Sequence, residues 1–210
     1  MSKSRGNVIS AMETLAQYEA DAVRFYFLKD GPIEKDETFS SMKLVDTYNA
    51  HVINEFANSM RRVSSPMFLP PPESPFILPP AEAKRDKDFI TNFNSKAKNI
   101  HTAFSKATIR SIIDLMQMTN QYLNTSKFWT IEDKKQQRRV IGTAAEALKV
   151  ISILLYPVTP NYAETLLKYF KVTDNERRLE NCRIEIDKEV ILKYDPKIRD
   201  KLFIRKLTHR

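Results

Sequence analysis

Seven of the chain's eleven prolines lie between Ser65 and Pro80, in the run SPMFLPPPESPFILPP. Proline has no backbone N–H to donate and its ring clashes with the preceding helical turn, so a helix cannot pass through such a segment. We therefore expect an irregular or polyproline-like strap over residues 65–80, with its apolar side chains packed on neighbouring helices. The rest of the chain must fold on either side of this strap.

Helical periodicity dominates both sides of the strap. Apolar residues spaced three and four apart predict helices over residues 10–18, 19–29, 42–64, 86–105, 107–125, 133–156 and 161–170. The helix over residues 133–156 begins with KKQQRR and ends with ALKVISILLY, so we expect its start to be exposed and its end buried. The five helices from residue 42 onward, joined mostly by short turns, favour a helical bundle. The predicted fold class is mainly α.

The last part of the chain departs from this pattern. The segments CRIEI and EVILKY alternate in polarity and predict two short strands, with a turn near Asp187 and Lys188 that would make a β-hairpin. Three parts are expected on these grounds: residues 1–41, a helical domain over 42–171 that includes the strap, and a tail over 172–210.

Composition excludes several classes of function. Only three glycines occur, too few for a complete nucleotide-binding α/β fold with its phosphate turns. A single cysteine, Cys182, excludes an internal disulfide and a cysteine-built zinc site. The three histidines are scattered without carboxylate or cysteine spacing, so no metal site is expected. No run of eighteen apolar residues occurs, so we expect no membrane partner.

The net charge of +8 is unevenly placed. Residues 1–62 hold eight Lys/Arg against nine Asp/Glu, which leaves twenty-six against seventeen in the remainder. This downstream excess favours a polyanionic partner, although solvated lysines on a helical protein reach the same total without binding anything.

Two places carry residue types suited to chemistry rather than packing. Met1, Ser2, Lys3 and Ser4 bring an ammonium and two hydroxyls together, which suits phosphate oxygens or, equally, a solvated terminus. Asn58 and Arg62 project from one helix face a single turn apart, as a surface pair or as a group that hydrogen-bonds bases and phosphate.

The only tryptophan, Trp129, follows the helix over residues 107–125. An indole at a helix junction is either a core anchor or a flat face on which an unpaired base stacks, which is worth about 1–3 kcal/mol per base. The sequence leaves both interpretations open.

These stretches resemble a known family. MSKSRGNVI resembles the KMSKS signature of class I aminoacyl-tRNA synthetases without its first lysine, and DAVRFYFLKDGPIEKDETFS resembles the segment that follows it in methionyl-tRNA synthetases. NEFANSMRR resembles the helix of that family whose Asn and Arg contact the anticodon, which falls on Asn58 and Arg62. The family also carries an anticodon-contacting tryptophan at the position of Trp129, where Phe128 replaces the usual preceding proline.

The resemblance implies a function. It implies the C-terminal part of a methionine-tRNA ligase, which activates methionine with ATP and Mg²⁺ and transfers it to tRNA(Met). It also implies that Met1, Ser2, Lys3 and Ser4 bind ATP, that Lys3 is catalytic, and that Asn58, Arg62 and Trp129 bind the anticodon. The nucleotide-binding half with its HIGH signature would precede Met1, so we expect this chain alone to bind no ATP and to be inactive.

The short C-terminus favours a monomeric enzyme of the mitochondrial matrix, with a bacterial cytoplasmic one second. Two alternatives stay open. The chain could be a fragment of another class I synthetase, which shares the signature and a helical bundle, or a non-catalytic basic helical module that binds tRNA or a protein.

Overall fold

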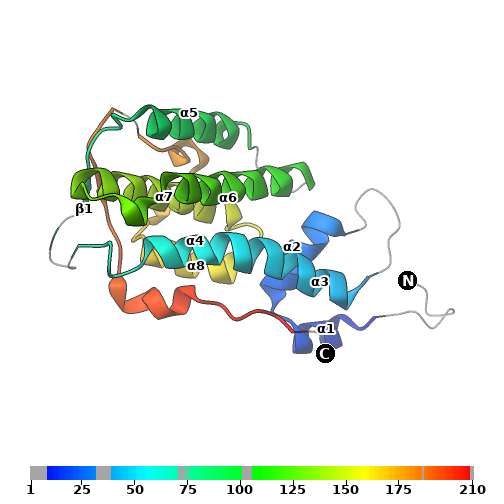
Figure 1. Ribbon diagram of the computed structural model, residues 1–210. Helices are drawn as coiled ribbons and strands as arrows, with labels where there is room; N and C mark the ends of the chain where they lie inside the picture. Colours follow the sequence, from blue (N-terminus) through cyan, green and yellow to red (C-terminus); the bar gives the residue numbers. More distant parts are fainter. Residues whose placement is uncertain are drawn as a thin grey trace.

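The computed structural model describes residues 9–31, 39–70, 74, 76–100, 106–185 and 187–208. Within these ranges the fold is mainly helical, as predicted (Figure 1). The helices are α1 Ala11–Gln17, α2 Ala20–Asp30, α3 Ser41–Tyr48, α4 Asn58–Val63, α5 Lys84–Lys98, α6 Lys106–Ser126, α7 Lys134–Leu155 and α8 Pro160–Tyr169.

Helix starts follow from local side-chain chemistry. Ser10 and Ser40 each accept a hydrogen bond from the backbone N–H three residues on, at the starts of α1 and α3. Asp133 caps α7 by accepting from the Lys135 N–H at 2.8 Å. Pro160 opens α8, where its missing N–H costs nothing because the first helical N–H groups have no partner within the helix.

The predicted helix over residues 42–64 is one continuous rod with a wide middle. The π-helix η2, Asn49–Ala57, joins α3 to α4. Its apolar side chains, which include Val52 and Phe56, face the core. The wider turn sets the direction in which α4, and with it Asn58 and Arg62, faces its neighbours.

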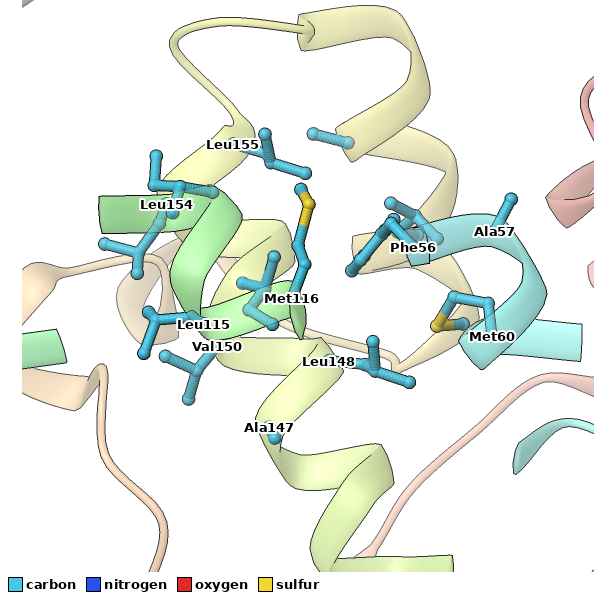
Figure 2. Packing of buried hydrophobic residues seen from close by; sticks show 14 of the residues in the cluster. Phe56, Ala57, Met60, Leu115, Met116, Ala147, Leu148, Val150, Leu154 and Leu155 are labelled. Atoms are coloured by element: carbon cyan, nitrogen blue, oxygen red, sulfur yellow. The ribbon is translucent and has the colours of Figure 1, made fainter. Parts of the chain in front are cut away.

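Helix α7 lies at the centre of the core. It contacts α6, α8, α5 and α4, and almost every residue from Val140 to Leu155 is buried. Figure 2 shows Phe56 and Met60 approaching Leu148 of α7 from one side, with Met116 of α6 beside them. The bundle expected from the sequence is therefore present, and it is built around the part of α7 from Val140 to Leu155.

The exposed start expected for the helix over residues 133–156 was wrong in part. Lys134, Lys135 and Arg138 are exposed, but Gln137 and Arg139 are buried. Gln137 donates to the Phe128 carbonyl at 3.0 Å and Arg139 donates to the Pro79 carbonyl. Both side chains thus pair with backbone carbonyls of segments that cross α7. The Nε and Nη2 of Arg139 are buried without a hydrogen-bond partner in the part of the chain that the structure describes.

The β-hairpin expected in the tail was also wrong. Residues 182–185 form no strand, and β2, Val190–Leu192, pairs instead with β1, Phe76–Leu78, inside the proline-rich strap. The pair is antiparallel, with Phe76 opposite Leu192. Residues 76–78 contain no proline, so this short piece of the strap can donate and accept the backbone hydrogen bonds of a strand pair.

Leu78 of this strand packs directly onto Gly142 of α7. A Cβ at residue 142 would lie 2.5 Å from the side chain of Leu78, so the strap approaches the central helix too closely for any larger residue without a shift. The strap and the tail are thereby fixed to the bundle.

On both sides of β2, the described part of the tail consists of short helical turns and irregular segments. The 3-10 helices η4, Asp174–Glu176, and η5, Leu179–Asn181, precede β2, and η6, Pro196–Leu202, follows it. In Figure 1 the last segment runs along α4 and α3 toward α1.

Candidate nucleic-acid interface

Asn58 and Arg62 lie on the same face of α4, as their spacing predicts. The Asn58 side chain is exposed and donates to the Asn54 carbonyl one turn earlier at 3.0 Å. Arg62 is half-buried and turns toward α6. One amide therefore faces solvent while the neighbouring guanidinium is held against a second helix.

Two amides on α6 hold the guanidinium of Arg62. Its Nη1 donates to Oδ1 of Asn120 at 3.2 Å and to Oδ1 of Asn124 at 2.8 Å. Asn120 and Asn124 are four residues apart, so both project from one face of α6. Because the acceptors are neutral, the positive charge of Arg62 is not cancelled by its supports.

Partial burial lowers the pKa of Arg62 below its ordinary value. No described acidic side chain forms an ion pair with it. An arginine stays protonated under all physiological conditions, so this site offers a fixed positive charge.

Trp129 lies beside this cation and is exposed. Its relative exposure is 52%, and the Arg62 Cζ lies 5.7 Å from the centroid of the indole ring. The indole is therefore not enclosed in the core, and about half of it packs against its neighbours. Its immediate neighbour Phe128 is the core anchor, since it is 2% exposed and packs edge-on against Phe68 at 4.9 Å.

The short 3-10 helix η3, Phe128–Thr130, sets the orientation of the indole. Lys127 adopts a left-handed conformation with φ of 44°, which ends α6 and turns the chain. Such a conformation is uncommon for a residue with a side chain and persists where its surroundings hold it. Here Thr130 donates to the Lys127 carbonyl through its backbone N–H and its hydroxyl, both at 2.8 Å.

Farther from Trp129, the contact between η2 and α6 has a different character. Gln117 donates to Glu55 at 3.1 Å, and Glu55 also contacts His51 Nδ1 at 3.1 Å. The Glu55 carboxylate thus lies at one end of this row of polar contacts, and the Arg62 guanidinium, held by two neutral amides, lies at the other. An anionic ligand is favoured at the Arg62 end.

Other kinds of site find no support in the described ranges. No cluster of three His, Cys, Asp or Glu side chains capable of holding a metal ion occurs among the residues that the structure describes. In the same part of the chain no helix is long and apolar enough to cross a membrane.

Comparisons with known proteins show what the chain is similar to. The family model described as tRNA synthetases class I (M) matches residues 1–64. The methionine–tRNA ligase of Caldanaerobacter subterraneus is 26% identical over 204 residues, which cover 90% of this chain and 31% of that protein. The probable mitochondrial methionine–tRNA ligase of Neurospora crassa is 26% identical over 205 residues, 89% of this chain and 33% of that protein.

The chain resembles the C-terminal part of methionyl-tRNA synthetases. The methionyl-tRNA synthetase of Mycobacterium tuberculosis in complex with methionyl-adenylate shares its fold, with a TM-score of 0.80 at 20% identity. That match covers 92% of this chain and 39% of the synthetase structure. The chain spans about a third of the length of the curated synthetases that it matches.

The synthetase signature itself lies outside the described residues. Met1, Ser2, Lys3 and Ser4 fall in the segment before residue 9, so their assigned roles stay predictions.

Sequence reasoning missed Asn120 and Asn124. Their four-residue spacing at the end of a helix, in NQYLN, was the available signal. This spacing does not predict that the two amides face Arg62, because their partner depends on how α6 packs against α4.

Proposed function

We propose that this chain is the anticodon-binding part of a methionine–tRNA ligase, and that Asn58, Arg62 and Trp129 contact the anticodon of tRNA(Met). One observation carries the proposal: the guanidinium of Arg62 is held by two neutral amides with its Cζ 5.7 Å from the ring centroid of an exposed indole. Residues separated in sequence thereby form one surface.

The chemistry of this surface suits a single-stranded loop. An exposed indole offers a face on which an unpaired base stacks. The guanidinium beside it donates hydrogen bonds to a base edge or a phosphate, and the Asn58 amide both donates and accepts. Double-stranded RNA hides its base faces, so a loop is the better ligand.

We infer the activity of the whole polypeptide from its relatives. We propose that it activates methionine with ATP and Mg²⁺ and then transfers the methionyl group to tRNA(Met). Met1, Ser2, Lys3 and Ser4 would contact the ATP phosphates, with the Lys3 ammonium stabilising charge that develops as pyrophosphate leaves. The 210 residues span only about a third of the relatives, so alone they are expected neither to bind ATP nor to form the adenylate.

The proposed location is the mitochondrial matrix, and the proposed state is a monomer. Relatives from Neurospora crassa and Dictyostelium discoideum are described as mitochondrial, while similar bacterial proteins exist. Subcellular fractionation with an antibody to this chain would test the compartment, and a cytosolic signal would contradict it.

A competition titration tests the anticodon assignment. The 210-residue chain is mixed with a labelled stem-loop that carries a CAU anticodon, and unlabelled competitors carry CAU or a scrambled loop on the same stem. We expect the CAU competitor to displace the label at a concentration at least tenfold lower than the scrambled one. Equal competition would refute anticodon recognition, and a stronger effect from another anticodon would point to a different class I synthetase.

A further inference from the structure

The last segment of the chain is anchored along the side of the helix that carries Asn58 and Arg62. Leu202 is fully buried, and its carbonyl accepts from the Tyr162 hydroxyl at 3.2 Å. Asn49, at the start of η2, forms two 2.9 Å hydrogen bonds with the backbone of Leu207, one to its carbonyl and one from its N–H. The segment therefore has a defined path along the rod of α3, η2 and α4 (Figure 1).

One face of this segment is apolar and turned inward. Its inward side chains pack on the core: Ile198, Leu202, Phe203, Ile204 and Leu207. The guanidinium of Arg61 lies 5.0 Å from the centre of the Phe203 ring, which joins α4 to the segment directly.

The opposite face carries positive charge. Residues 196–208 contain five basic side chains against one acidic, Asp200. Four of the basic side chains are exposed, and they form what we call the basic strip: Lys197, Lys201, Arg205 and Lys206. None of the four forms an ion pair with a described acidic side chain. The anchoring groups are thus separate from the charged groups, which leaves the charges free for a ligand.

Helix geometry places the tail at Phe203 against a side of α4 that adjoins the proposed anticodon surface. Consecutive residues of a helix point about 100° apart. Arg61 therefore faces the tail while Arg62 faces α6 and Trp129. Asn58, one turn earlier, is exposed on the surface between these two directions. An RNA that touches Asn58 lies between α6 on one side and the strip on the other.

We propose that the basic strip binds the phosphate backbone of the RNA that adjoins the bound anticodon loop. This inference rests on the proposed function. Lysine and arginine on an extended, exposed segment contact phosphates without reading sequence, and each contact makes binding weaker as salt rises. The strip therefore supplies affinity, whereas Asn58, Arg62 and Trp129 supply the choice of anticodon.

The test is the salt dependence of binding. The triple variant Lys201→Gln, Arg205→Gln, Lys206→Gln removes three charges from the strip. Its matched control, Lys84→Gln, Lys87→Gln, Lys98→Gln, removes three exposed charges from α5, whose packing partners are α6 and α7. Binding of the CAU and scrambled stem-loops is measured from about 50 to 300 mM salt, and circular dichroism confirms that both variants fold.

We expect the strip variant to bind the CAU stem-loop at least about tenfold more weakly at about 0.1 M salt. The slope of log K against log salt should become shallower by about two, since each lost phosphate contact removes roughly 0.7 to 0.9. The preference for CAU over the scrambled loop should be unchanged, and the α5 control should match the unmodified chain.

Two results would overturn the inference: a slope equal to that of the α5 control, or a loss of CAU preference without a change in slope. A missing CAU preference in the unmodified chain, together with the expected slope change, would instead refute the anticodon assignment while leaving backbone binding by the strip intact.

Discussion

The guanidinium of Arg62 donates to Asn124 of α6 at 2.8 Å and to Asn120 at 3.2 Å, so a helix before the proline-rich strap is joined by polar contacts to one after it. The same contacts set the cation beside the exposed ring of Trp129. The position of Arg62 therefore depends on α6 as much as on its own helix.

Removing these supports should weaken RNA binding without unfolding the chain. In the double variant Asn120→Ala, Asn124→Ala, the guanidinium loses two acceptors and gains freedom that must be given up on binding. We expect a loss of about 3- to 20-fold in affinity for the CAU stem-loop, measured by titration. Gln121→Ala, an exposed change on the same helix, is the control, and an equal effect from it would contradict a positioning role.

Trp129 and Phe128 should separate binding from stability. Trp129→Ala is expected to weaken CAU stem-loop binding by at least 1 kcal/mol and to leave the melting temperature nearly unchanged, because the indole is half exposed. Phe128→Ala empties a buried site and should lower the free energy of unfolding by about 3 kcal/mol or more. The reverse pattern would mean that the indole, not the phenyl ring, anchors the core.

Asn49 should control the order of the tail. Asn49→Ala removes both hydrogen bonds to Leu207 and is expected to expose the segment after residue 202 to trypsin, at its own lysines and arginines, several-fold faster than in the unmodified chain. Limited proteolysis with mass spectrometry measures the cleavage rates. Asn99→Ala, an exposed change at the end of α5, is the control, and equal rates in both would show that other contacts fix the tail.

Stability should fall in acid partly through Glu164. Arg177 donates to its carboxylate at 2.7 and 3.3 Å, and this bond holds the pKa of Glu164 below its ordinary value of 4.5. A carboxyl group with a depressed folded-state pKa stabilises the fold above its unfolded pKa and loses that effect as pH falls through the folded value. The free energies of unfolding of Glu164→Gln and the unmodified chain, measured with denaturant, should therefore differ at pH 7, and the difference should shrink as pH falls below about 4.5 through the lowered folded-state pKa. A difference that does not depend on pH would exclude this ion pair as the cause.

Lys3 is testable in a chimera in which residues 1–210 replace the matching part of the Caldanaerobacter ligase. Lys3→Ala is expected to reduce the rate of methionine-dependent ATP–pyrophosphate exchange by at least about 100-fold. The Lys3 ammonium would no longer stabilise the negative charge that develops on the departing pyrophosphate. Binding of the CAU stem-loop should not change. A normal exchange rate would remove Lys3 from the catalytic step.

Periodicity located the helices well, because apolar spacing directly encodes which face of each helix is buried. It did not locate contacts between backbone and side chain. Gln137 and Arg139 belong to a basic, polar stretch that the sequence predicts to be exposed. In the structure they are buried, and they donate hydrogen bonds to the carbonyls of Phe128 and Pro79. A backbone carbonyl that accepts such a hydrogen bond cannot be predicted from the types of residue in the sequence.

The strand pairing failed for a related reason. Residues 182–192 alternate as a hairpin would, yet Val190–Leu192 found its partner in Phe76–Leu78, far away in sequence. A three-residue strand carries too few side chains to specify its partner locally. Proline density correctly predicted that the strap is not helical, but it hid the one proline-free stretch that is able to form a ladder.

The candidate site was predictable only as separate parts. Spacing placed Asn58 and Arg62 on one face, and resemblance to the synthetase family added Trp129. The placement of Trp129 beside Arg62 depends on the left-handed turn at Lys127, and a lysine gives no sequence signal for that conformation. The supports Asn120 and Asn124 became visible only through packing.

The account's central claim is that Trp129 stacks on a base of the bound anticodon loop. Trp129 is the only tryptophan, so intrinsic fluorescence reports on this side chain alone. Titration with a CAU stem-loop should quench the emission with the same midpoint as binding, and a scrambled loop at equal occupancy should quench it much less. Binding of the CAU loop with unchanged emission would contradict the claim, because an indole in contact with a stacked base cannot keep the fluorescence of the free chain.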